Sequence, residues 1–184
     1  MRCNGGGGQA ALRAGMPRAL HELAEHYHPD VIITISAAGP SDIPSLLASA
    51  DALIRTDAAV FDADATNVAW AMSGGAAYCA ALVAAGDDFA LLARDEGQVI
   101  GHIVGRRYGP NELHPIITAE LESIYVYPAH RGRGVGGLLV RSFLERVAGV
   151  DRVTVSAYAQ NTRALSFYTR LGFKVSSVIL DLDL

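Results

Sequence analysis

Four glycines and two arginines stand together in the stretch RGRGVGG, from Arg131 to Gly137. The apolar residues on either side predict that this stretch joins a strand to a helix that begins near Gly134. The first turn of a helix presents backbone N–H groups without intrahelical partners, together with a partial positive charge. Glycines let a ligand approach that backbone closely, and the arginines add positive charge. The stretch therefore predicts an anion site that could hold a pyrophosphate.

Two other phosphate-binding loops use similar glycines, and the sequence disfavours both. A P-loop needs Gly-Lys-Ser/Thr, whereas the only lysine of the chain is Lys174. The Rossmann fingerprint G-x-G-x-x-G is met between Gly132 and Gly137, with Asp151 at about the expected distance. However, the preceding strand is predicted to end near Tyr127, too early for the tight turn of that fingerprint. Asp151 also precedes the next strand, and the chain that remains is short for a dinucleotide-binding domain.

A second segment, NTRALSFYTRLGF from Asn161 to Phe173, follows the glycine turn after one intervening strand. It resembles the N-x-x-A-x-x-F-Y-x-x-L-G-F segment of the GNAT superfamily of acyl-CoA N-acyltransferases. Arg131–Gly136 likewise resembles the R/Q-x-x-G-x-G/A motif of that superfamily, preceded by a strand that ends V-x-P at Val126 and Pro128. The specific motifs lie between residues 119 and 173, and the order of elements from 31 to 184 also resembles the family fold.

The resemblance implies that acetyl-CoA is the co-substrate and that no metal takes part. It places the pantetheine arm in an opening between two neighbouring strands, where it pairs with one of them as an added strand. Backbone groups from Ile124 through Tyr125 to Val126 would bind that arm, and Asn161 would bind it by its side chain while also capping the following helix. The pyrophosphate would lie on the amides of Arg131, Gly132, Arg133, Gly134, Val135, Gly136 and Gly137.

The resemblance also implies catalytic roles for a tyrosine and a carboxylate. Tyr168 would contact the cofactor and protonate the departing CoA thiolate, while Phe167 beside it serves the core. The attacking amine must lose a proton, and Glu120 and Glu122 are the candidate bases because alternation places both on one face of their strand. Glu120, our first choice, matches the position of the base in some GNAT enzymes; Glu122 lies nearer the acetyl group.

The acceptor is expected to be a primary amine of a small molecule or peptide, attacked directly in a ternary complex. Acidic side chains at Asp57, Asp62, Asp64 and Glu112, with His114 nearby, favour a cationic amine such as an aminoglycoside, a polyamine or an amino-acid derivative. These residues lie in two regions, RTDAAVFDADATN and GPNELHP, and an ordinary solvated loop explains them equally well.

The elements that must position these residues follow from hydrophobic periodicity. We expect an α/β (α+β) domain built on a single mixed, mostly antiparallel twisted sheet of about six to seven strands, with helices on both faces. Residues 1–15 are predicted to be a flexible Gly-rich leader and 16–30 a short helix, ahead of a GNAT domain at 31–184. Strands are expected at 31–38, on both sides of the turn at 95–97, and at 117–127, 152–158 and 174–184. Helices are expected from a cap at Ser41 to Arg55, within 68–86, and at 135–149 and 162–172.

Composition limits the possible partners. The net charge of −4 gives no general attraction to nucleic acid or to an anionic membrane. The uncharged stretch 68–86 is as long as a membrane span, but it is rich in Ala and Gly and lacks flanking basic clusters, which favours a buried helix or helix pair. Cys3 and Cys79 without a signal-peptide pattern predict reduced thiols and a cytoplasmic protein. A homodimer whose chains share a sheet is possible, as in many family members.

Three other hypotheses follow from particular residues. A non-catalytic acyl-CoA-binding module would keep the glycine turn and dispense with Tyr168 and the two glutamates. A nucleotide-dependent oxidoreductase would need the glycine turn to be a Rossmann fingerprint. A metal site at His21, His26 and His28 is disfavoured, because no cysteine supports it and their spacing suits a solvated helix end.

Overall fold

The computed structural model describes residues 32–64 and 66–182, so the predicted leader at 1–15 and helix at 16–30 lie outside the described residues. The centre of the fold is one five-stranded sheet in the order β1-β2-β3-β4-β5. The first four strands are antiparallel, and β4 and β5 are parallel. The strands are β1 (Ile33–Ala37), β2 (Phe89–Asp95), β3 (Gln98–Tyr108), β4 (Thr118–Val126) and β5 (Arg152–Val155).

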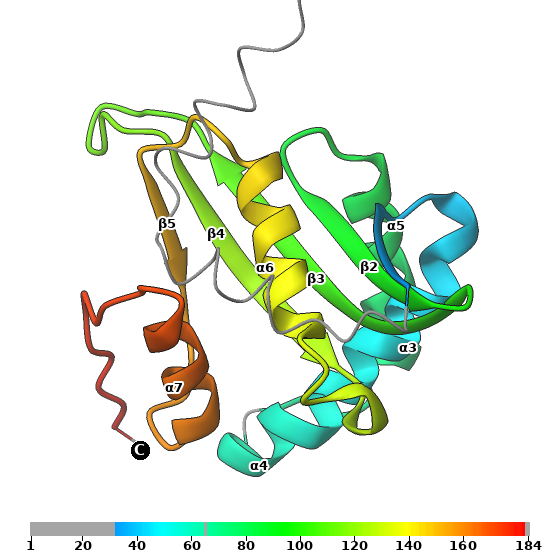
Figure 1. The fold of residues 1–184 in the computed structure, drawn as a ribbon. Coiled ribbons are helices and arrows are strands. Elements are labelled where there is room, and N and C mark those ends of the chain that lie inside the picture. Colours follow the sequence, from blue (N-terminus) through cyan, green and yellow to red (C-terminus); the bar gives the residue numbers. More distant parts are fainter. Residues whose placement is uncertain (1–31, 65, 183–184) are drawn as a thin grey trace, which may run out of the picture.

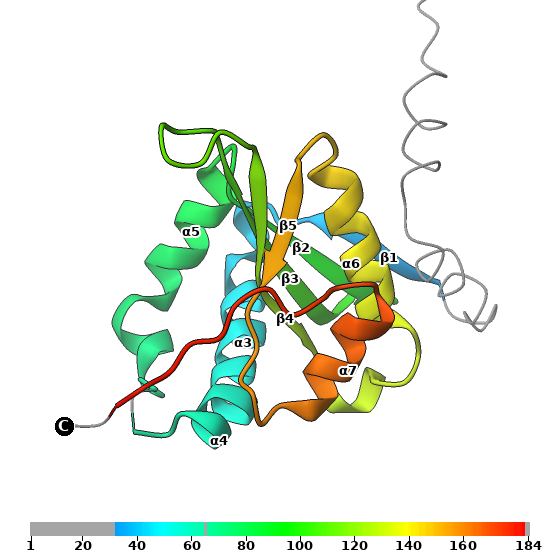
Figure 2. The same ribbon diagram turned by 90° about the vertical axis from the view of Figure 1, so that its left-hand side faces the viewer.

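Helices cover both faces of this sheet, as the sequence predicted (Figures 1 and 2). One face carries α3 (Ile43–Leu53) and α5 (Ala76–Ala84); the other carries α6 (Val135–Arg146), with α7 (Thr162–Arg170) beside it. After α3 the chain continues through a π-helical turn, Ile54–Ala58, into the short α4 (Ala59–Phe61). A second π-helical turn, Ala71–Gly75, leads into α5, so residues 70–84 of the uncharged stretch form one continuous helical segment. No helix in the described part of the chain is long and apolar enough to cross a bilayer.

Each face of the sheet has its own hydrophobic core. Alternation along the strands divides the side chains between the two cores, so that neighbours such as Ile103 and Val104 belong to different ones. The core under α6 includes Leu139, Val140 and Phe143, all fully buried. The core under α3 and α5 includes Leu46, Cys79, Leu82, Leu92 and Val104. The sheet is thus held between two helical layers, which fixes the positions of its strand ends.

A tight hairpin joins β2 to β3, as expected from the sequence. Its two loop residues, Glu96 and Gly97, have φ of 48° and 84°. Positive φ at both central residues is the requirement of a type I′ turn, whose twist matches that of the flanking strands. Arg133 from the glycine turn reaches the base of this hairpin and donates to Asp95 at 2.9 Å.

A β-bulge at Glu122 changes the course of β4. Val104 of β3 lies opposite Ser123, and the next residue, Gly105, lies opposite Leu121, so Glu122 has no partner on β3. The alternation of side chains shifts at this point. Before the bulge Leu121 points into the core under α6, whereas after it Ile124 does so. A bulge bends its strand and increases the local twist.

The strand β5 is shorter than predicted, and its end coincides with this bulge. The pairing of β4 with β5 stops at Leu121 and Val155, and residues 156–158 are no longer in the sheet. Because β4 bends where the pairing stops, the two segments separate and leave an opening. The sequence predicts a strand that continues to Tyr158, but strand propensity alone does not specify where a neighbouring strand turns away.

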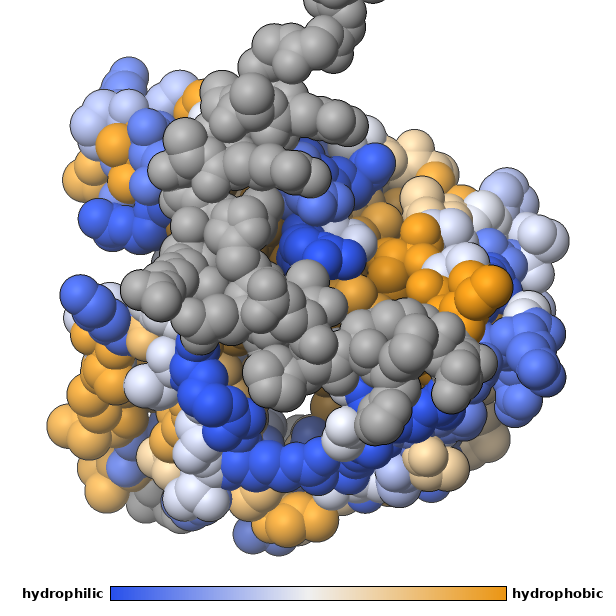
Figure 3. Space-filling view, in the orientation of Figure 1, coloured by the Kyte–Doolittle hydropathy of each residue, from blue (hydrophilic) through white to orange (hydrophobic). Residues whose placement is uncertain are grey.

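Two other predictions were wrong. Residues 174–182, expected to be the last strand, have no regular secondary structure, so the described sheet has five strands rather than six or seven. The backbone of this segment pairs with no strand of the sheet, and its side chains at Val175, Ile179 and Leu180 are 80% exposed or more. Figure 3 shows apolar residues of this segment gathered at the lower left. Ser41 is not the cap of α3, because a short 3₁₀ turn moves the N-cap to Asp42, whose carboxylate accepts from the Gly39 amide.

Gly105 provides a test of how tightly the sheet packs against α6. A β-carbon at this position would lie 2.5 Å from Phe89 Cζ and 2.7 Å from Phe143 Cε2. We therefore expect Gly105→Ala to lower the free energy of unfolding by about 1–3 kcal/mol, the usual cost of overpacking a core. Chemical denaturation measures this loss.

Gly109→Ala, directly after the last residue of the same strand, is the matched control. A β-carbon there would meet no atom within 4 Å, and its effect should stay below about 1 kcal/mol. Equal effects of the two substitutions would contradict the packing described.

Candidate active site

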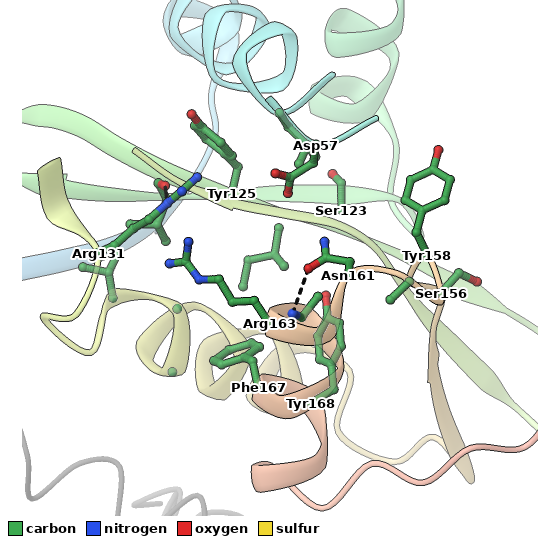
Figure 4. Close-up of a pocket in the computed structure, with 18 of the residues that line it drawn as sticks. Asp57, Ser123, Tyr125, Arg131, Ser156, Tyr158, Asn161, Arg163, Phe167 and Tyr168 are labelled. Atoms are coloured by element: carbon green, nitrogen blue, oxygen red, sulfur yellow. Dashed lines mark hydrogen bonds between the residues drawn. The ribbon is translucent and has the colours of Figure 1, made fainter. Parts of the chain in front are cut away.

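The opening between β4 and β5 contains a pocket of about 680 Å³. This volume lies within the range of small-molecule and cofactor sites. Its walls are the carboxyl-terminal half of β4, the turn before α6, residues 156–158 after β5, and α7; the end of α3 and the π-helical turn close it from the other layer (Figure 4). Residues of both sequence motifs, the glycine turn at 131–137 and the segment 161–173, therefore line the same pocket.

The glycine turn has the geometry that its composition suggested. Gly132 and Gly134 have φ of 79° and 78°, in the left-handed region that favours glycine. Gly134 is the N-cap of α6 and provides no side-chain cap, so the first amides of that helix have no such partner. The turn and the helix start, from Arg131 to Gly137, line the pocket except for Arg133. This end of α6 can therefore bind an anion.

The two arginines of the turn have different environments. Arg131 lines the pocket; its Nε donates to the Val126 carbonyl at 2.8 Å, and its guanidinium lies over the Tyr125 ring. Arg133 does not line the pocket, because its guanidinium is held by Asp95 and by His130 Nδ1, both at 2.9 Å. The predicted positive charge near the anion site therefore comes from Arg131, and Arg133 ties the turn to the β2-β3 hairpin.

Two arginines of α7 also line the pocket, and the sequence analysis missed them. Arg163 lies near the start of α7 and Arg170 at its end, and Figure 4 shows Arg163 extending from α7 toward the same space as Arg131. Both residues stand at variable positions of the recognised motif, so only the shape of the pocket identifies them. Together with Arg131 they make this wall of the pocket cationic.

Asn161 caps α7, as predicted, and it also lines the pocket. Its Oδ1 accepts from the Ala164 amide at 3.0 Å, which is the usual N-cap bond. The cap uses the carbonyl oxygen, so the Asn161 amide nitrogen keeps its two donors. Beside it, Phe167 packs against Gly136 of α6, where a β-carbon would come within 3.3 Å of the ring. This contact sets the distance between α6 and α7.

Tyr168 lines the pocket and is almost buried, with 8% of the residue exposed. Burial raises the pKa of Tyr168 to about 12, and the negative charge of Asp57 adds to this effect. The phenol is therefore protonated at neutral pH and can donate a proton or a hydrogen bond. Figure 4 shows Asp57 and Tyr168 on opposite walls of the pocket, both directed into it.

The two candidate bases lie in different places. Glu122, at the bulge, lines the pocket; its carboxylate accepts from Tyr78 and from Arg106. Glu120 is not among the lining residues, and its Oε2 accepts from the Tyr108 hydroxyl at 2.9 Å. The structure thus brings our second choice to the pocket and leaves the first choice outside it. Of the acidic residues expected around the acceptor, Asp57 lines the pocket, whereas Asp62, Asp64, Glu112 and the neighbouring His114 do not.

The backbone of β4 offers an edge for an extended ligand. Ile124, Tyr125 and Val126 all line the pocket, and β5 does not pair with this part of β4. A flexible chain can therefore add alongside β4 as a further strand. The cationic turn lies at the far end of this edge and Glu122 at the near end, so the pocket suits a long ligand with an anionic group at one end. Among the described residues, no group of His, Cys, Asp or Glu is arranged to hold a metal ion.

Comparison with known proteins identifies relatives among acetyltransferases. The chain is 36% identical to the peptidyl-lysine N-acetyltransferase YjaB of Salmonella typhimurium over 62 residues, 33% of this chain and 41% of that protein. It is 30% identical to the mycothiol acetyltransferase of Frankia casuarinae over 160 residues, 81% of this chain and 46% of that protein. The chain spans about half or less of the length of these relatives.

Solved structures show the same fold. A mutant of the BH1408 protein from Bacillus halodurans superposes with a TM-score of 0.73 at 18% identity, covering 82% of this chain and 99% of that one. The aminoglycoside N-acetyltransferase AAC(6')-Iy in complex with CoA superposes with a TM-score of 0.65 at 17% identity, covering 85% and 98%. The model of the acetyltransferase (GNAT) family matches residues 57–173, more than half of the chain and nearly all of the pocket lining. The chain therefore belongs to the GNAT acetyltransferase family.

Proposed function

We propose that this protein transfers the acetyl group of acetyl-CoA to a primary amine. One observation carries the proposal: a single pocket joins the amino end of α6, the unpaired edge of β4 and the Tyr168 side chain. An anion-binding helix end, an edge for an extended arm and a proton donor are the three features that a bound acyl-CoA requires.

In the proposed complex the pyrophosphate lies on the amides between Gly132 and Gly137, with Arg131 beside them. The pantetheine arm runs along Ile124–Val126 toward Glu122, and Asn161 donates to it. In this proposal the amine attacks the thioester carbonyl directly, and Cys79, the one cysteine in the described residues, is buried and does not line the pocket. Tyr168 donates its proton to the sulfur as the carbon–sulfur bond breaks.

The proposed acceptor carries a positive charge before it reacts. Glu122 and Asp57 are the acidic residues among the pocket lining, and they attract an ammonium group. Relatives act on such amines: one is named for peptidyl lysine, and a structural neighbour is named for aminoglycosides. A base function for Glu122, or for Glu120 behind it, stays a prediction. The cytoplasmic location and the homodimer predicted above also stay predictions, and sedimentation of the full chain tests the second.

The reaction itself is tested by measuring CoA release with a thiol reagent. Purified protein and acetyl-CoA are mixed with a lysine peptide, an aminoglycoside, a polyamine and an amino-acid amide. Release of CoA that depends on one of these amines supports the proposal. Tight binding of acetyl-CoA without release by any amine would instead favour the non-catalytic module.

Tyr168→Phe tests the proton donor. Removing one hydroxyl should lower kcat by about 10²-fold or more while the KM for acetyl-CoA changes little, because the donor acts on the leaving group. An acid works in its protonated form, and the pKa of Tyr168 is raised to about 12. The wild-type rate should therefore show no alkaline decline from this residue below about pH 11. An alkaline decline near pH 9 that disappears in Tyr168→Phe would contradict the assignment.

Arg163→Ala tests the cationic wall. Loss of a charged contact to a phosphate costs about 1.5–3 kcal/mol, so the KM for acetyl-CoA should rise about 10-fold or more with kcat nearly unchanged. Arg152→Ala is the matched control, since this exposed arginine at the start of β5 does not line the pocket. The same rise in KM for both variants would contradict a direct contact of Arg163 with the phosphates, because it would show that the net charge of the protein alone affects the binding of acetyl-CoA.

A further inference from the structure

A buried histidine holds a serine of the pocket wall. Ser123 lines the pocket on β4, directly after the bulge. Its Oγ lies 3.3 Å from Nε2 of His102 on β3, and Nδ1 of the same ring lies 2.7 Å from Oγ of Ser49 on α3. His102 and Ser49 are both 0% exposed. The Ser123 side chain is therefore held from inside the protein by two side chains that do not themselves line the pocket.

The imidazole stands in an otherwise apolar layer. His102 lies opposite Leu92 on β2, and Leu92 and Val104 both belong to the core under α3. A leucine at position 102 would fit such a layer and would avoid the cost of burying polar atoms. The histidine instead has a serine on each of its two nitrogens, and one of these serines faces the pocket. This polar connection indicates a role at the pocket.

The direction of the two hydrogen bonds follows from the protons that are present. Burial lowers the pKa of His102 to about 4, so the ring is neutral at physiological pH and has one N–H and one lone pair. One serine must therefore donate to the ring, and the other must accept from it. The Ser49 hydroxyl is fully buried and needs an acceptor for its proton, which Nδ1 provides at 2.7 Å. Nε2 then carries the ring proton and donates to Ser123.

This direction leaves the proton of Ser123 free for a ligand. The Ser123 oxygen accepts from Nε2, so its own O–H can turn into the pocket. Ser49 donates to the ring, the ring donates to Ser123, and Ser123 donates to the ligand. Hydrogen bonds in such a series polarise one another, which makes the last hydroxyl a stronger donor. The buried pair thus presents one oriented donor to the pocket.

Ser123 and Tyr168 face the pocket from opposite sides (Figure 4). In the proposed complex the pantetheine arm runs along Ile124–Val126 toward Glu122, so the thioester lies beside Ser123. The sulfur and the oxygen of a thioester are bound to the same carbon. Tyr168 has one proton and gives it to the sulfur, so the oxygen needs a different donor on the other side.

We propose that Ser123, oriented by His102 and Ser49, donates a hydrogen bond to the thioester carbonyl oxygen and stabilises the negative charge that forms there during acetyl transfer. This inference rests on the proposed function. Ser123 is then a catalytic residue, because it touches the reacting group. His102 and Ser49 are positioning residues, because they act through Ser123.

Ser123 stabilises the charge without giving up its proton. The lone pair of the neutral amine forms the C–N bond while the π pair of the carbonyl moves to the oxygen, which accepts from Ser123. The pair then returns, the C–S bond breaks, and the sulfur receives the proton of Tyr168. The nitrogen loses one proton, which returns to the Tyr168 phenolate. The reaction balances, and no oxidant or further reactant is needed.

Ser123→Ala tests the donor in the full chain, with acetyl-CoA and an amine that the wild type acetylates. Loss of one oxyanion donor lowers kcat by about 10²–10³-fold, and the KM values for acetyl-CoA and the amine should change little. Ser123→Thr keeps the hydroxyl and should recover most of the loss. Ser45→Ala, at an exposed position of α3 outside the pocket, is the matched control and should keep the wild-type kcat.

His102→Leu and His102→Gln test the orientation of Ser123. Leucine removes the donor to Ser123, so kcat should fall toward the level of Ser123→Ala. Glutamine can donate from its amide nitrogen and should retain more of the wild-type kcat. Adding His102→Leu to Ser123→Ala should cause little further loss, because both changes act through the same hydroxyl. A fully additive loss would instead make the role of His102 structural and would contradict the positioning role.

Two spectra give readouts that do not depend on turnover. A hydrogen bond lowers the stretching frequency of a carbonyl, so infrared spectra of bound acetyl-CoA with a ¹³C-labelled carbonyl should show a higher frequency in Ser123→Ala than in the wild type. ¹⁵N NMR of the wild type should show a neutral His102 ring with its proton on Nε2. A proton on Nδ1 would contradict the donor direction.

Two results in Ser123→Ala would overturn the inference while leaving acetyl transfer intact. A wild-type kcat with an unchanged carbonyl frequency would leave the backbone amides of β4 as the donors to the oxygen. A rise in the KM for the amine with an unchanged kcat would place Ser123 at the acceptor and not at the thioester. Absence of CoA release from the wild type with every amine would instead remove the proposed function.

Discussion

The bulge at Glu122 is the constraint on which the rest of the site depends. It ends the pairing of β4 with β5 at Leu121 and Val155, and the two segments separate to form the pocket. It also shifts the alternation of side chains, so that Ile124 and Val126 pack under α6 while Ser123 turns toward His102. Without the extra residue β4 and β5 could continue to pair, and the edge proposed to bind the pantetheine arm would be occupied.

The two helical layers supply the functional groups to this opening. The start of α6 points its free amides into the pocket because Gly134 adopts a left-handed conformation that a side chain would disfavour. The contact of Gly136 with Phe167 brings α7 close enough for Asn161 and Tyr168 to face the same space. From the other layer, the π-helical turn after α3 brings Asp57 to the pocket. The groups proposed to bind the anion, to act as the acid and to attract the acceptor therefore meet where the sheet divides.

Much of this arrangement could be predicted from the sequence because local rules govern it. The glycine turn, the cap at Asn161, the hairpin at Glu96 and Gly97 and the helices on both faces follow from turn chemistry and periodicity. The predictions that failed concern features that depend on contacts between segments distant in the sequence. Residues 174–182 have strand propensity but no strand beside them, Arg133 pairs with a distant aspartate, and the bulge decides which residues of β4 reach the pocket. No local sequence pattern predicts that His102 is buried and hydrogen-bonded, because only the packing of α3 on the sheet brings its ring to Ser49 and Ser123.

The most direct test of the central claim is calorimetric titration of the protein with acetyl-CoA, CoA and NADH. A helix end that holds the CoA pyrophosphate, with an edge of β4 that holds its arm, predicts binding of acetyl-CoA and CoA at micromolar concentrations and no binding of NADH. Binding of NADH in preference to CoA, or no binding of CoA, would contradict the account and return the glycine turn to the dinucleotide-binding class.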